Sequence, residues 1–243
     1  MSISVRALTK TFGAHRAVND ISFDIPTGAL FCIVGPSGCG KSTLLRLIAG
    51  LEAPDSGTIT LDGMPVAGAN LLVAPEHRRV GVVFQSYALW PHLTVAQNVA
   101  FPDQAQGLPR AEALRRAADH LHTVALDTYA DRRPEALSGG QRQRVALARC
   151  LAGDARTILM DEPLANLDPH LREAMENELR AFHTRSGVTT LFITHDQREA
   201  MALADVMAVM EAGRILQIGP PQQVYAQPQD ETVARFIGRG TVV

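Results

Sequence analysis

The sequence has few cysteines and no excess of charge of one sign. Its three cysteines among 243 residues, Cys32, Cys39 and Cys150, are too few and too irregularly spaced for a disulfide framework or a zinc site, which fits a reducing compartment. The formal net charge of −2 comes from 23 basic and 25 acidic residues. A dedicated nucleic-acid binder usually carries a basic excess, so we expect no nucleic-acid partner.

Long hydrophobic runs are also missing. The longest apolar stretches, such as residues 29–34, are far shorter than the ~18 residues that a membrane-spanning helix needs. The first ten residues lack the apolar core of a signal peptide. With 46% hydrophobic and 20% charged residues, the composition is that of an ordinary globular chain that can bury a core without disulfide or metal staples. We therefore expect a soluble chain that can still dock on a membrane protein.

Strand-like and helix-like segments alternate on both sides of a mostly helical block at residues 94–151. This order predicts an α/β fold with a helical insertion. Residues 29–34 are apolar on both faces, as in a strand buried in a parallel sheet. The other predicted strands are 3–8, 22–25, 57–61, 79–84, 157–160, 188–193 and 206–210, and the predicted helices include 41–49, 109–126, 197–204, 220–226 and 231–237.

A glycine-rich segment separates the buried strand at 29–34 from the helix that follows it. Residues 35–42, GPSGCGKS, match the pattern G-x-x-x-x-G-K-[ST]. Glycines let successive backbone N–H groups point inward, and the following helix adds its positive N-terminal end. The segment therefore suits phosphates, the alternative being a chance glycine-rich loop. Lys41 would reach the terminal phosphates, and Ser42 would bind Mg²⁺ through its hydroxyl. The predicted nucleotide-binding residues here are Gly35, Pro36, Ser37, Gly38, Cys39, Gly40, Lys41, Ser42 and Thr43.

Two adjacent acids end the apolar strand at residues 157–160. Carboxylates at the C-terminal end of a parallel strand lie where α/β sheets bind ligands. Asp161 fits a second Mg²⁺ ligand, and Glu162 could accept a proton from an attacking water. The alternative is an exposed acidic turn, which the phosphate loop in the same chain disfavours.

A third motif, Leu137-Ser138-Gly139-Gly140-Gln141, precedes a helix through residues 145–151. Its serine and glycine N–H groups make a second anion-binding helix start. Taken alone it could be a simple helix cap, but it stands between the phosphate loop and the carboxylate strand. With these three motifs in this order, the sequence resembles the ATP-binding subunits of ABC transporters over essentially its whole length.

The resemblance implies further roles at matching positions. Phe12 looks like the aromatic residue that stacks on adenine, the alternative being an ordinary core phenylalanine. Gln85 looks like the glutamine that senses Mg²⁺ and the attacking water, and His195 like the switch histidine near the γ-phosphate. Asp168 looks like the residue that crosses the dimer interface and also caps its helix. The implied catalytic set is Glu162, His195, Gln85 and Lys41, the metal set is Ser42, Gln85 and Asp161, and the remaining nucleotide contacts are Phe12, Ser138, Gly139, Gly140, Gln141 and Asp168.

The resemblance also implies a Mg²⁺-dependent ATPase that powers import. Two copies would face head to tail, with each ATP between the phosphate loop of one and the Ser138 motif of the other. The chain would bind transmembrane permease subunits at the cytoplasmic face of the membrane, as a peripheral protein, and serve a solute-binding protein indirectly. Alternatives are a non-transport ABC-type ATPase, disfavoured by one cassette without a heptad insertion, and a non-catalytic nucleotide-binding regulatory module.

Residues 86–95 resemble importers of this family, especially those that serve sugars, polyamines, ferric iron, sulfate and phosphonates. Trp90, the only tryptophan, lies there, where the family meets its permease; a hydrophobic plug between subdomains is the alternative. We expect one P-loop ATPase domain, with residues 1–90 and 152–243 forming a core with an N-terminal antiparallel β subdomain, and residues 91–151 a helical subdomain. A C-terminal regulatory domain, common in this branch, is expected to be missing from this sequence.

Two side-chain types complete the expectations. Cys39 lies near a helix N-terminus and Lys41, which would favour its thiolate form and make it reactive. Arg142, Arg144 and Arg149 share one helix and are interpreted as surface or interface charges.

Overall fold

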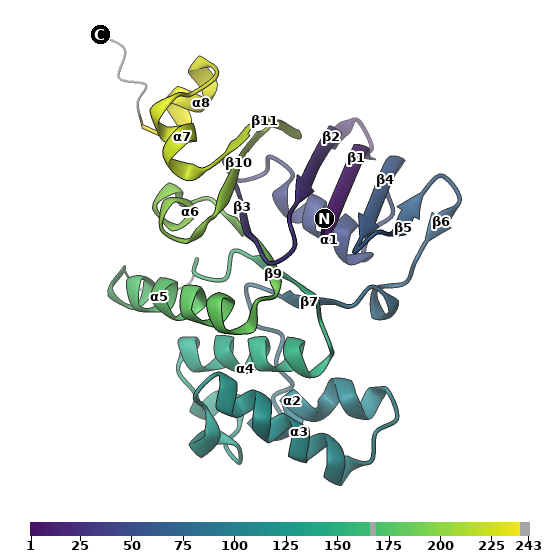
Figure 1. Cartoon of the computed structure of the whole chain (residues 1–243), viewed down its shortest axis with the longest axis vertical. Coiled ribbons are helices and arrows are strands. Elements are labelled where there is room, and N and C mark those ends of the chain that lie inside the picture. The colour runs from purple at the N-terminus through teal and green to yellow at the C-terminus, as the bar shows by residue number, and fades with distance from the viewer. Residues whose placement is uncertain (166–168, 239–243) are drawn as a thin grey trace. The chain divides into compact units, whose positions relative to one another are not determined.

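The computed structural model describes residues 1–165 and 169–238, and it divides into two compact units. The first unit contains Met1–Arg78 and the chain from His183 onward, and the second contains Arg79–Phe182 (Figure 1). These limits differ from the predicted boundaries near residues 90 and 152, which stay a prediction.

The first unit contains an antiparallel sheet with the strand order β2-β1-β4-β5-β6. One of its hairpin connections has the residues that a tight turn favours. Asp62 and Gly63 join β4 to β5 with φ angles of 46° and 81°, the paired left-handed conformation of a tight two-residue hairpin that Asp-Gly favours. The strands are β1 (Ile3–Phe12), β2 (His15–Ile25), β4 (Ser56–Leu61), β5 (Met64–Gly68) and β6 (Leu71–Leu72).

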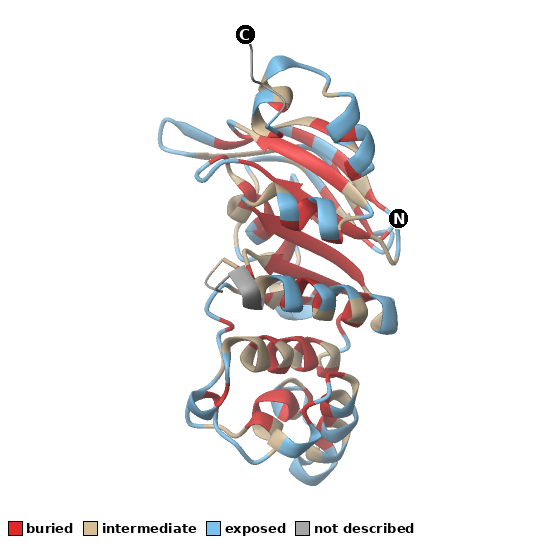
Figure 2. Cartoon of the chain, turned by 90° about the vertical axis from the view of Figure 1, so that its left-hand side faces the viewer, coloured by how far each residue is buried: buried red, intermediate tan, exposed pale blue. Residues whose placement is uncertain are grey.

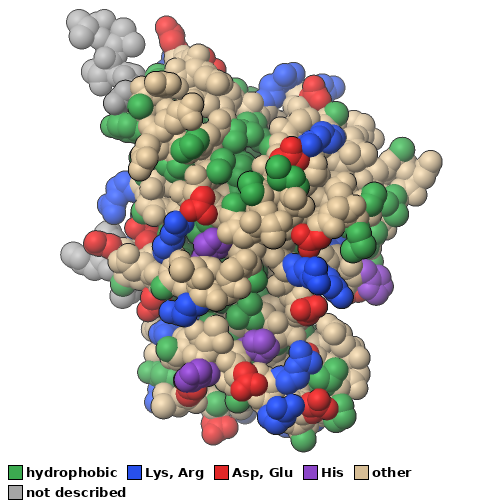
Figure 3. All heavy atoms as spheres, in the orientation of Figure 1, with side chains coloured by type: hydrophobic (Ala, Val, Ile, Leu, Met, Phe, Trp, Pro, Cys, Tyr) green, Lys and Arg blue, Asp and Glu red, His purple; other side chains and the backbone are tan. Residues whose placement is uncertain are grey.

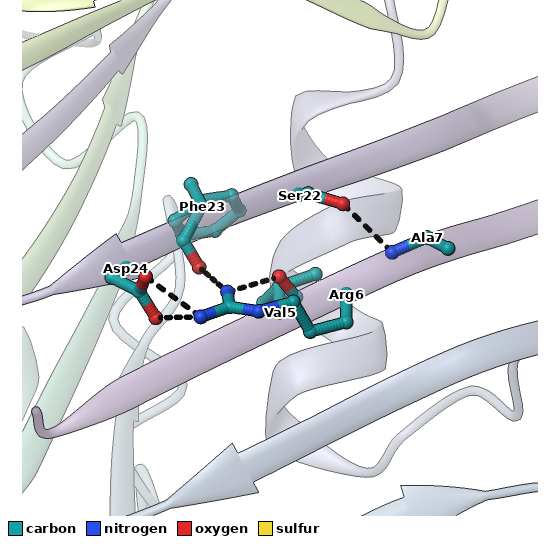
Figure 4. A network of polar contacts seen from close by, with 6 residues as sticks. All are labelled: Val5, Arg6, Ala7, Ser22, Phe23 and Asp24. Atoms are coloured by element: carbon teal, nitrogen blue, oxygen red, sulfur yellow. Dashed lines mark hydrogen bonds and ion pairs between the residues drawn. The ribbon is translucent and has the colours of Figure 1, made fainter.

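A bulge interrupts the ladder between β1 and β2 (Figure 4). Ala7 has a φ of 46°, and its N–H donates to the Ser22 hydroxyl at 2.8 Å. Beside it, the Arg6 guanidinium donates to both carboxylate oxygens of Asp24 at 2.8 Å and to the Phe23 carbonyl at 3.2 Å. The side chains thus replace ladder bonds that the bulge removes.

The nucleotide-loop strand lies in a second sheet of the first unit, in which β11, β10, β3 and β9 are successive neighbours. All five residues of β3 are buried, as its unbroken apolar sequence predicts, and buried strands cross the interior of the unit in Figure 2. β10 and β9 both run parallel to β3. The bounds are β3 (Leu30–Val34), β9 (Thr189–Thr194), β10 (Val206–Glu211) and β11 (Arg214–Gly219), with helices α1 (Lys41–Ala49), α6 (Gln197–Leu203), α7 (Pro221–Ala226) and α8 (Glu231–Phe236) and the 3₁₀ turn η1 (Pro75–His77).

The second unit pairs β7 in parallel with β8 and contains helices α2, α3 and α4, which lie together in Figure 1. The predicted helix at 109–126 is shorter, because the chain leaves the helix at Val124 and Ala125 adopts a φ of 54°. The bounds are β7 (Val80–Val83), β8 (Thr157–Asp161), α2 (Val95–Ala105), α3 (Arg110–Thr123), α4 (Gly139–Ala152) and α5 (Pro169–Ser186), with 3₁₀ turns η2 (Asp127–Tyr129) and η3 (Pro134–Ala136).

Three strands, β5, β6 and β11, were not predicted. β5 contains Pro65, which weakens a strand pattern, and β6 has only two residues. β11 follows a two-residue turn, Ala212-Gly213, with φ angles of 46° and 78°. Because alanine is uncommon in that conformation, the turn carries only half of the usual hairpin signal.

Candidate active site

The glycine-rich loop after β3 lies so close to neighbouring backbone that side chains are excluded at two positions. A Cβ on Gly35 would come within 2.0 Å of the Met210 carbonyl oxygen. A Cβ on Gly40 would come within 2.0 Å of the Ala17 carbonyl oxygen, and Gly40 has a φ of 107°. Only glycine fits such contacts, so these two positions let the loop pack directly against the backbone of β10 and β2.

Lys41 is buried and its ammonium group points back into this loop. It donates to the Gly35 carbonyl oxygen at 2.8 Å and to the Pro36 carbonyl oxygen at 3.0 Å. Among the described residues no side chain caps the start of α1, and its first turn contains no acid. The first amides of α1 and the ammonium of Lys41 therefore present positive charge together, as phosphate binding requires.

The strand register brings His195 to the same sheet edge as this loop. Val34, the last residue of β3, pairs with Thr194, the last residue of β9, so Gly35 and His195 follow at one end of two parallel strands. The turn at His195 is anchored, since the Thr194 hydroxyl donates to Glu199 at 2.5 Å and accepts from the Asp196 N–H at 2.9 Å. The exposed His195 is thus displayed by a turn with a buried support.

Phe12 ends β1 and is 47% exposed, which excludes the alternative of an ordinary core phenylalanine. The Lys10 ammonium lies 5.2 Å from the centre of its ring, a cation–π contact. Lys10 also pairs with Glu52 at 2.8 Å, and this hydrogen bond raises the pKa of Lys10. Stacking of a base on Phe12 stays a prediction.

In the second unit, a matching register places Gln85 beside the two acids. Val83 of β7 pairs with Met160 of β8, so Gln85 and Asp161-Glu162 follow at the same end of two parallel strands. Glu162 has a φ of 47°, a left-handed conformation that is strained for a glutamate. Strained residues persist where the surroundings hold them and cluster at functional sites, which favours a specific task for this carboxylate.

The Ser138 motif forms the N-terminus of α4, as predicted. Ser138 and Gln141 make a reciprocal capping box: the Ser138 hydroxyl accepts from the Gln141 N–H at 3.3 Å, and the Gln141 side chain accepts from the Ser138 N–H at 2.9 Å. A Cβ on Gly140 would lie 2.5 Å from the Met175 sulfur, so glycine lets the helix start lie close to α5. The motif is therefore both a cap and a helix N-terminus.

The structure assigns the predicted residues to two sets, each on one unit. The loop 35–42, Phe12 and His195 belong to the first unit, and the second contains Gln85, Asp161, Glu162 and the Ser138 motif. Asp168 lies outside the described residues, so its predicted interface and capping roles stay predictions.

The prediction of a reactive Cys39 thiolate is wrong. Cys39 is buried, and burial raises the pKa of its thiol more than the nearby Lys41 ammonium, 3.9 Å away, lowers it. Cys32 and Cys150 are also buried with raised pKa values. Burial thus outweighs the field of the helix start.

The interpretation of three arginines on α4 as surface or interface charges needs correction for Arg144 and Arg149, and stays a prediction for Arg142. Arg149 is half-buried and donates to the Ala88 carbonyl at 2.6 Å and to the Tyr87 carbonyl at 3.1 Å. Arg144 donates to the Val124 carbonyl at 3.1 Å and pairs with Glu178 at 3.2 Å. These two side chains bind backbone carbonyls within their unit. Acidic and basic side chains are interspersed on the face shown in Figure 3.

An exposed aromatic cluster follows Gln85 in the second unit. Trp90 and Phe101 are each 42% exposed, with ring centres 5.4 Å apart, and His92 lies 6.3 Å from Trp90. Asn98, which sequence reasoning missed, fixes this segment: it is fully buried and bonds to the backbone of Trp90, Leu93 and Thr94. The capping-box pattern Thr94-x-x-Gln97 was the signal that a helix begins beside it.

Residues 1–165 and 169–238 lack two kinds of feature. None of the helices there combines the length and apolar character that crossing a membrane requires. Nor do those residues contain a cluster of three or more His, Cys, Asp or Glu side chains that could hold a metal ion.

Curated relatives align with nearly the whole chain. It is 49% identical over 240 residues to the spermidine/putrescine import ATP-binding protein PotA of Methylococcus capsulatus, covering 99% of this chain and 61% of that protein. It is 47% identical over 236 residues to the sn-glycerol-3-phosphate import ATP-binding protein UgpC 1 of Rhizobium johnstonii, covering 97% and 63%. The chain thus spans about three fifths of the length of these relatives.

Solved structures agree on the architecture. CbiO1 from Clostridium perfringens, described as part of an ABC transporter complex, superposes with a TM-score of 0.82 at 28% identity, covering 96% of this chain and 94% of that one. A dimeric ATP-binding cassette in a post-hydrolysis state, bound to ADP and Pi, gives 0.76 at 30% identity, covering 90% and 98%. The predicted P-loop α/β fold with its antiparallel subdomain and helical insertion is confirmed. Since the ABC transporter family model matches residues 18–165, the chain belongs to the ABC transporter family.

Proposed function

We propose that this chain hydrolyses ATP in a head-to-tail dimer and so powers solute import through a membrane-embedded permease. The observation that carries the proposal is the glycine cradle, in which Gly35 and Gly40 leave no room for a Cβ and Lys41 closes the loop. A backbone surface with an adjoining helix N-terminus suits phosphate groups. The dimeric cassette bound to ADP and Pi supports the same reading.

The residues present fit ATP and Mg²⁺. The loop amides and Lys41 would hold the phosphates, Phe12 would stack on the base, and the oxygens of Ser42, Gln85 and Asp161 are the donors that Mg²⁺ prefers. When bound, Mg²⁺ would neutralise charge that develops on the phosphates.

Proton transfer falls to Glu162, whose strained backbone follows β8 directly. This carboxylate would accept the proton of the attacking water, with Gln85 orienting that water and His195 contacting the γ-phosphate. The Ser138 helix start of a second copy would complete each site, because it supplies another set of amides that favours anions.

The exposed cluster of Trp90, His92 and Phe101 is the surface that we assign to the permease. This assignment makes the chain a peripheral subunit on the cytoplasmic side of the membrane, where a solute-binding protein would act on it only indirectly. Relatives named for polyamine import and for glycerol-3-phosphate import match with similar identity, which favours solute selection by the partner subunits.

Steady-state turnover of MgATP by the purified chain tests the proposal. We expect Glu162→Gln to keep ATP binding and to lose about 10²–10⁴-fold in turnover, the usual contribution of a positioned base. Glu173→Gln, at an exposed position on α5, is the matched control and should turn over like the wild type. Lys41→Ala should instead weaken ATP binding. Unchanged turnover in Glu162→Gln would refute the assigned base.

A mixing experiment tests the composite site. A Ser138→Arg chain and a Lys41→Ala chain should each be inactive alone, while their mixture regains activity because one of the two sites is intact. Wild-type activity should rise more steeply than protein concentration. Strict proportionality from dilute protein upward, with no rescue in the mixture, would argue against shared sites.

A further inference from the structure

Gln85 lies in a short turn that is closed by main-chain hydrogen bonding. The Tyr87 N–H donates to the Phe84 carbonyl at 2.8 Å, so Gln85 is the first of the two residues at the tip. Tyr87 and Ala88 then adopt φ angles of 62° and 46°. Two successive left-handed residues without glycine are disfavoured, and they persist only when their surroundings hold them.

Arg149, on α4, makes the contacts that stabilise these two residues. Its guanidinium donates to the carbonyl oxygens of Tyr87 and Ala88, at 3.1 and 2.6 Å, and so bridges the two strained residues across 61 positions of sequence. Burial lowers the pKa of this guanidinium, so a group partly removed from water makes these contacts. Carbonyl acceptors facing a charged donor make stronger hydrogen bonds than neutral pairs.

Asn98 makes a second stabilising contact farther along the segment that follows Gln85. The Asn98 side chain accepts from the Trp90 N–H at 2.8 Å and donates to the Trp90 carbonyl at 3.1 Å. The chain between Gln85 and α2 is thus fixed at two places, one from α4 and one from α2. Of these two contacts, the one made by Arg149 adjoins the turn of Gln85.

We propose that Arg149 is a positioning residue that fixes the turn displaying Gln85, so that the placement of Gln85 depends on the helix that begins at Ser138. The part of this inference that concerns turnover rests on the proposed function. Helix α4 then connects the Ser138 motif with the turn of Gln85. Its N-terminus carries the motif, and its third turn contacts the loop that contains Gln85 and Trp90.

The planar fork of arginine is essential to this geometry. Two nitrogens of one rigid group reach two successive carbonyls, whereas a lysine ammonium is a single point donor on a flexible stem. Arg149→Lys should therefore recover only part of what Arg149→Met loses. Arg144→Met is the matched control, because Arg144 lies on the same helix and also binds a backbone carbonyl, that of Val124.

Trp90 reports directly on the segment, since it is the only tryptophan. In the full 243-residue chain, acrylamide quenching of its fluorescence should increase in Arg149→Met, remain near wild type in Arg144→Met and be intermediate in Arg149→Lys. Exchange of the Tyr87 amide should quicken roughly tenfold, the factor that the loss of one charged hydrogen bond corresponds to. Wild-type quenching and exchange in Arg149→Met would overturn the proposal.

Turnover provides the second readout. Arg149→Met should lower kcat for MgATP about tenfold and leave KM within about twofold, because the turn of Gln85 is disturbed and the phosphate loop is not. An unchanged kcat together with altered Trp90 quenching would overturn the link to Gln85. If the wild-type chain hydrolyses no ATP, the proposed function fails, and the fluorescence and exchange measurements still decide whether Arg149 fixes the turn.

Discussion

Arg78 offers the sharpest test of how the phosphate-loop helix is held. Its buried guanidinium donates to four carbonyl oxygens: Leu47 and Ile48 at 2.9 Å, Val73 at 2.8 Å and Val66 at 3.1 Å. The first two belong to the last turn of α1, where the Leu47 carbonyl also accepts from the Gly50 N–H at 3.2 Å. Arg78 therefore ties the C-terminal end of α1 to the antiparallel sheet.

Replacing Arg78 with Met removes every donor and keeps a side chain of comparable length. The Leu47 and Val66 carbonyls keep the N–H groups of Gly50 and Val73 as donors, so the Ile48 and Val73 carbonyls are the two that lose their donor. Each buried carbonyl left without a partner costs about 1–3 kcal/mol, and the loss of positive charge at a helix C-terminus adds about 0.3–1 kcal/mol. Water that reaches either of these two carbonyls, and the relief of no longer burying a charge, reduce the total. We expect a loss of about 4 kcal/mol in the free energy of unfolding, which lowers Tm by roughly 8–16 °C for a chain of this size.

Thermal unfolding followed by circular dichroism measures this effect, and amide exchange of Leu51, which donates to the Arg46 carbonyl at the end of α1, localises it. Arg46→Met is the control, since Arg46 is exposed on the same helix and should change Tm by only a degree or two. Gly50→Ala should reproduce part of the loss, because a Cβ there would lie 2.4 Å from the Arg78 Nε atom. Equal Tm values for Arg78→Met and Arg46→Met would refute the reasoning.

Two further predictions follow from other contacts. Ser138→Ala should remove the cap of α4 at a cost of about 1 kcal/mol and raise exchange of the Gln141 amide roughly fivefold, measured by hydrogen exchange. Cys39 should react slowly with iodoacetamide at neutral pH and faster above its ordinary pKa of 9.0, because burial raises the pKa of the folded thiol. Because the folded thiol has the higher pKa, the Cys39 thiol ionises at lower pH in the unfolded chain than in the folded one. The contribution of the neutral thiol to the free energy of unfolding is therefore fully present below pH 9.0 and should be lost as the pH rises above that value.

A specific result would contradict each of the Ser138 and Cys39 predictions. Ser138→Thr keeps a capping hydroxyl and should retain most of the protection of Gln141; equal exchange in the Thr and Ala variants would show that the cap contributes nothing. If Cys39 is labelled at neutral pH as fast as free cysteine, then the positive charge of the loop and Lys41 lowers the thiol pKa more than burial raises it. Mass spectrometry identifies the labelled thiol.

The phosphate loop and the Ser138 cap were predictable because their chemistry is local. Each depends on a few adjacent residues whose backbone preferences favour one conformation: glycine for positive φ, serine for a helix start. The buried strand β3 was predictable too, since an unbroken apolar run suits burial on both faces. The order of the motifs then indicated the family.

The roles of Arg78, Arg149 and Asn98 could not be read from the sequence. Their partners are backbone carbonyls, which every residue offers, so no pattern of side chains marks the pairing. Arg149 meets Tyr87 and Ala88 only because α4 packs beside the loop after β7, and the buried state of Cys39 likewise reverses the effect expected from its neighbours. The sequence by itself thus determined the local anion-binding motifs, whereas tertiary packing decided which polar groups lose water and which carbonyls they bind.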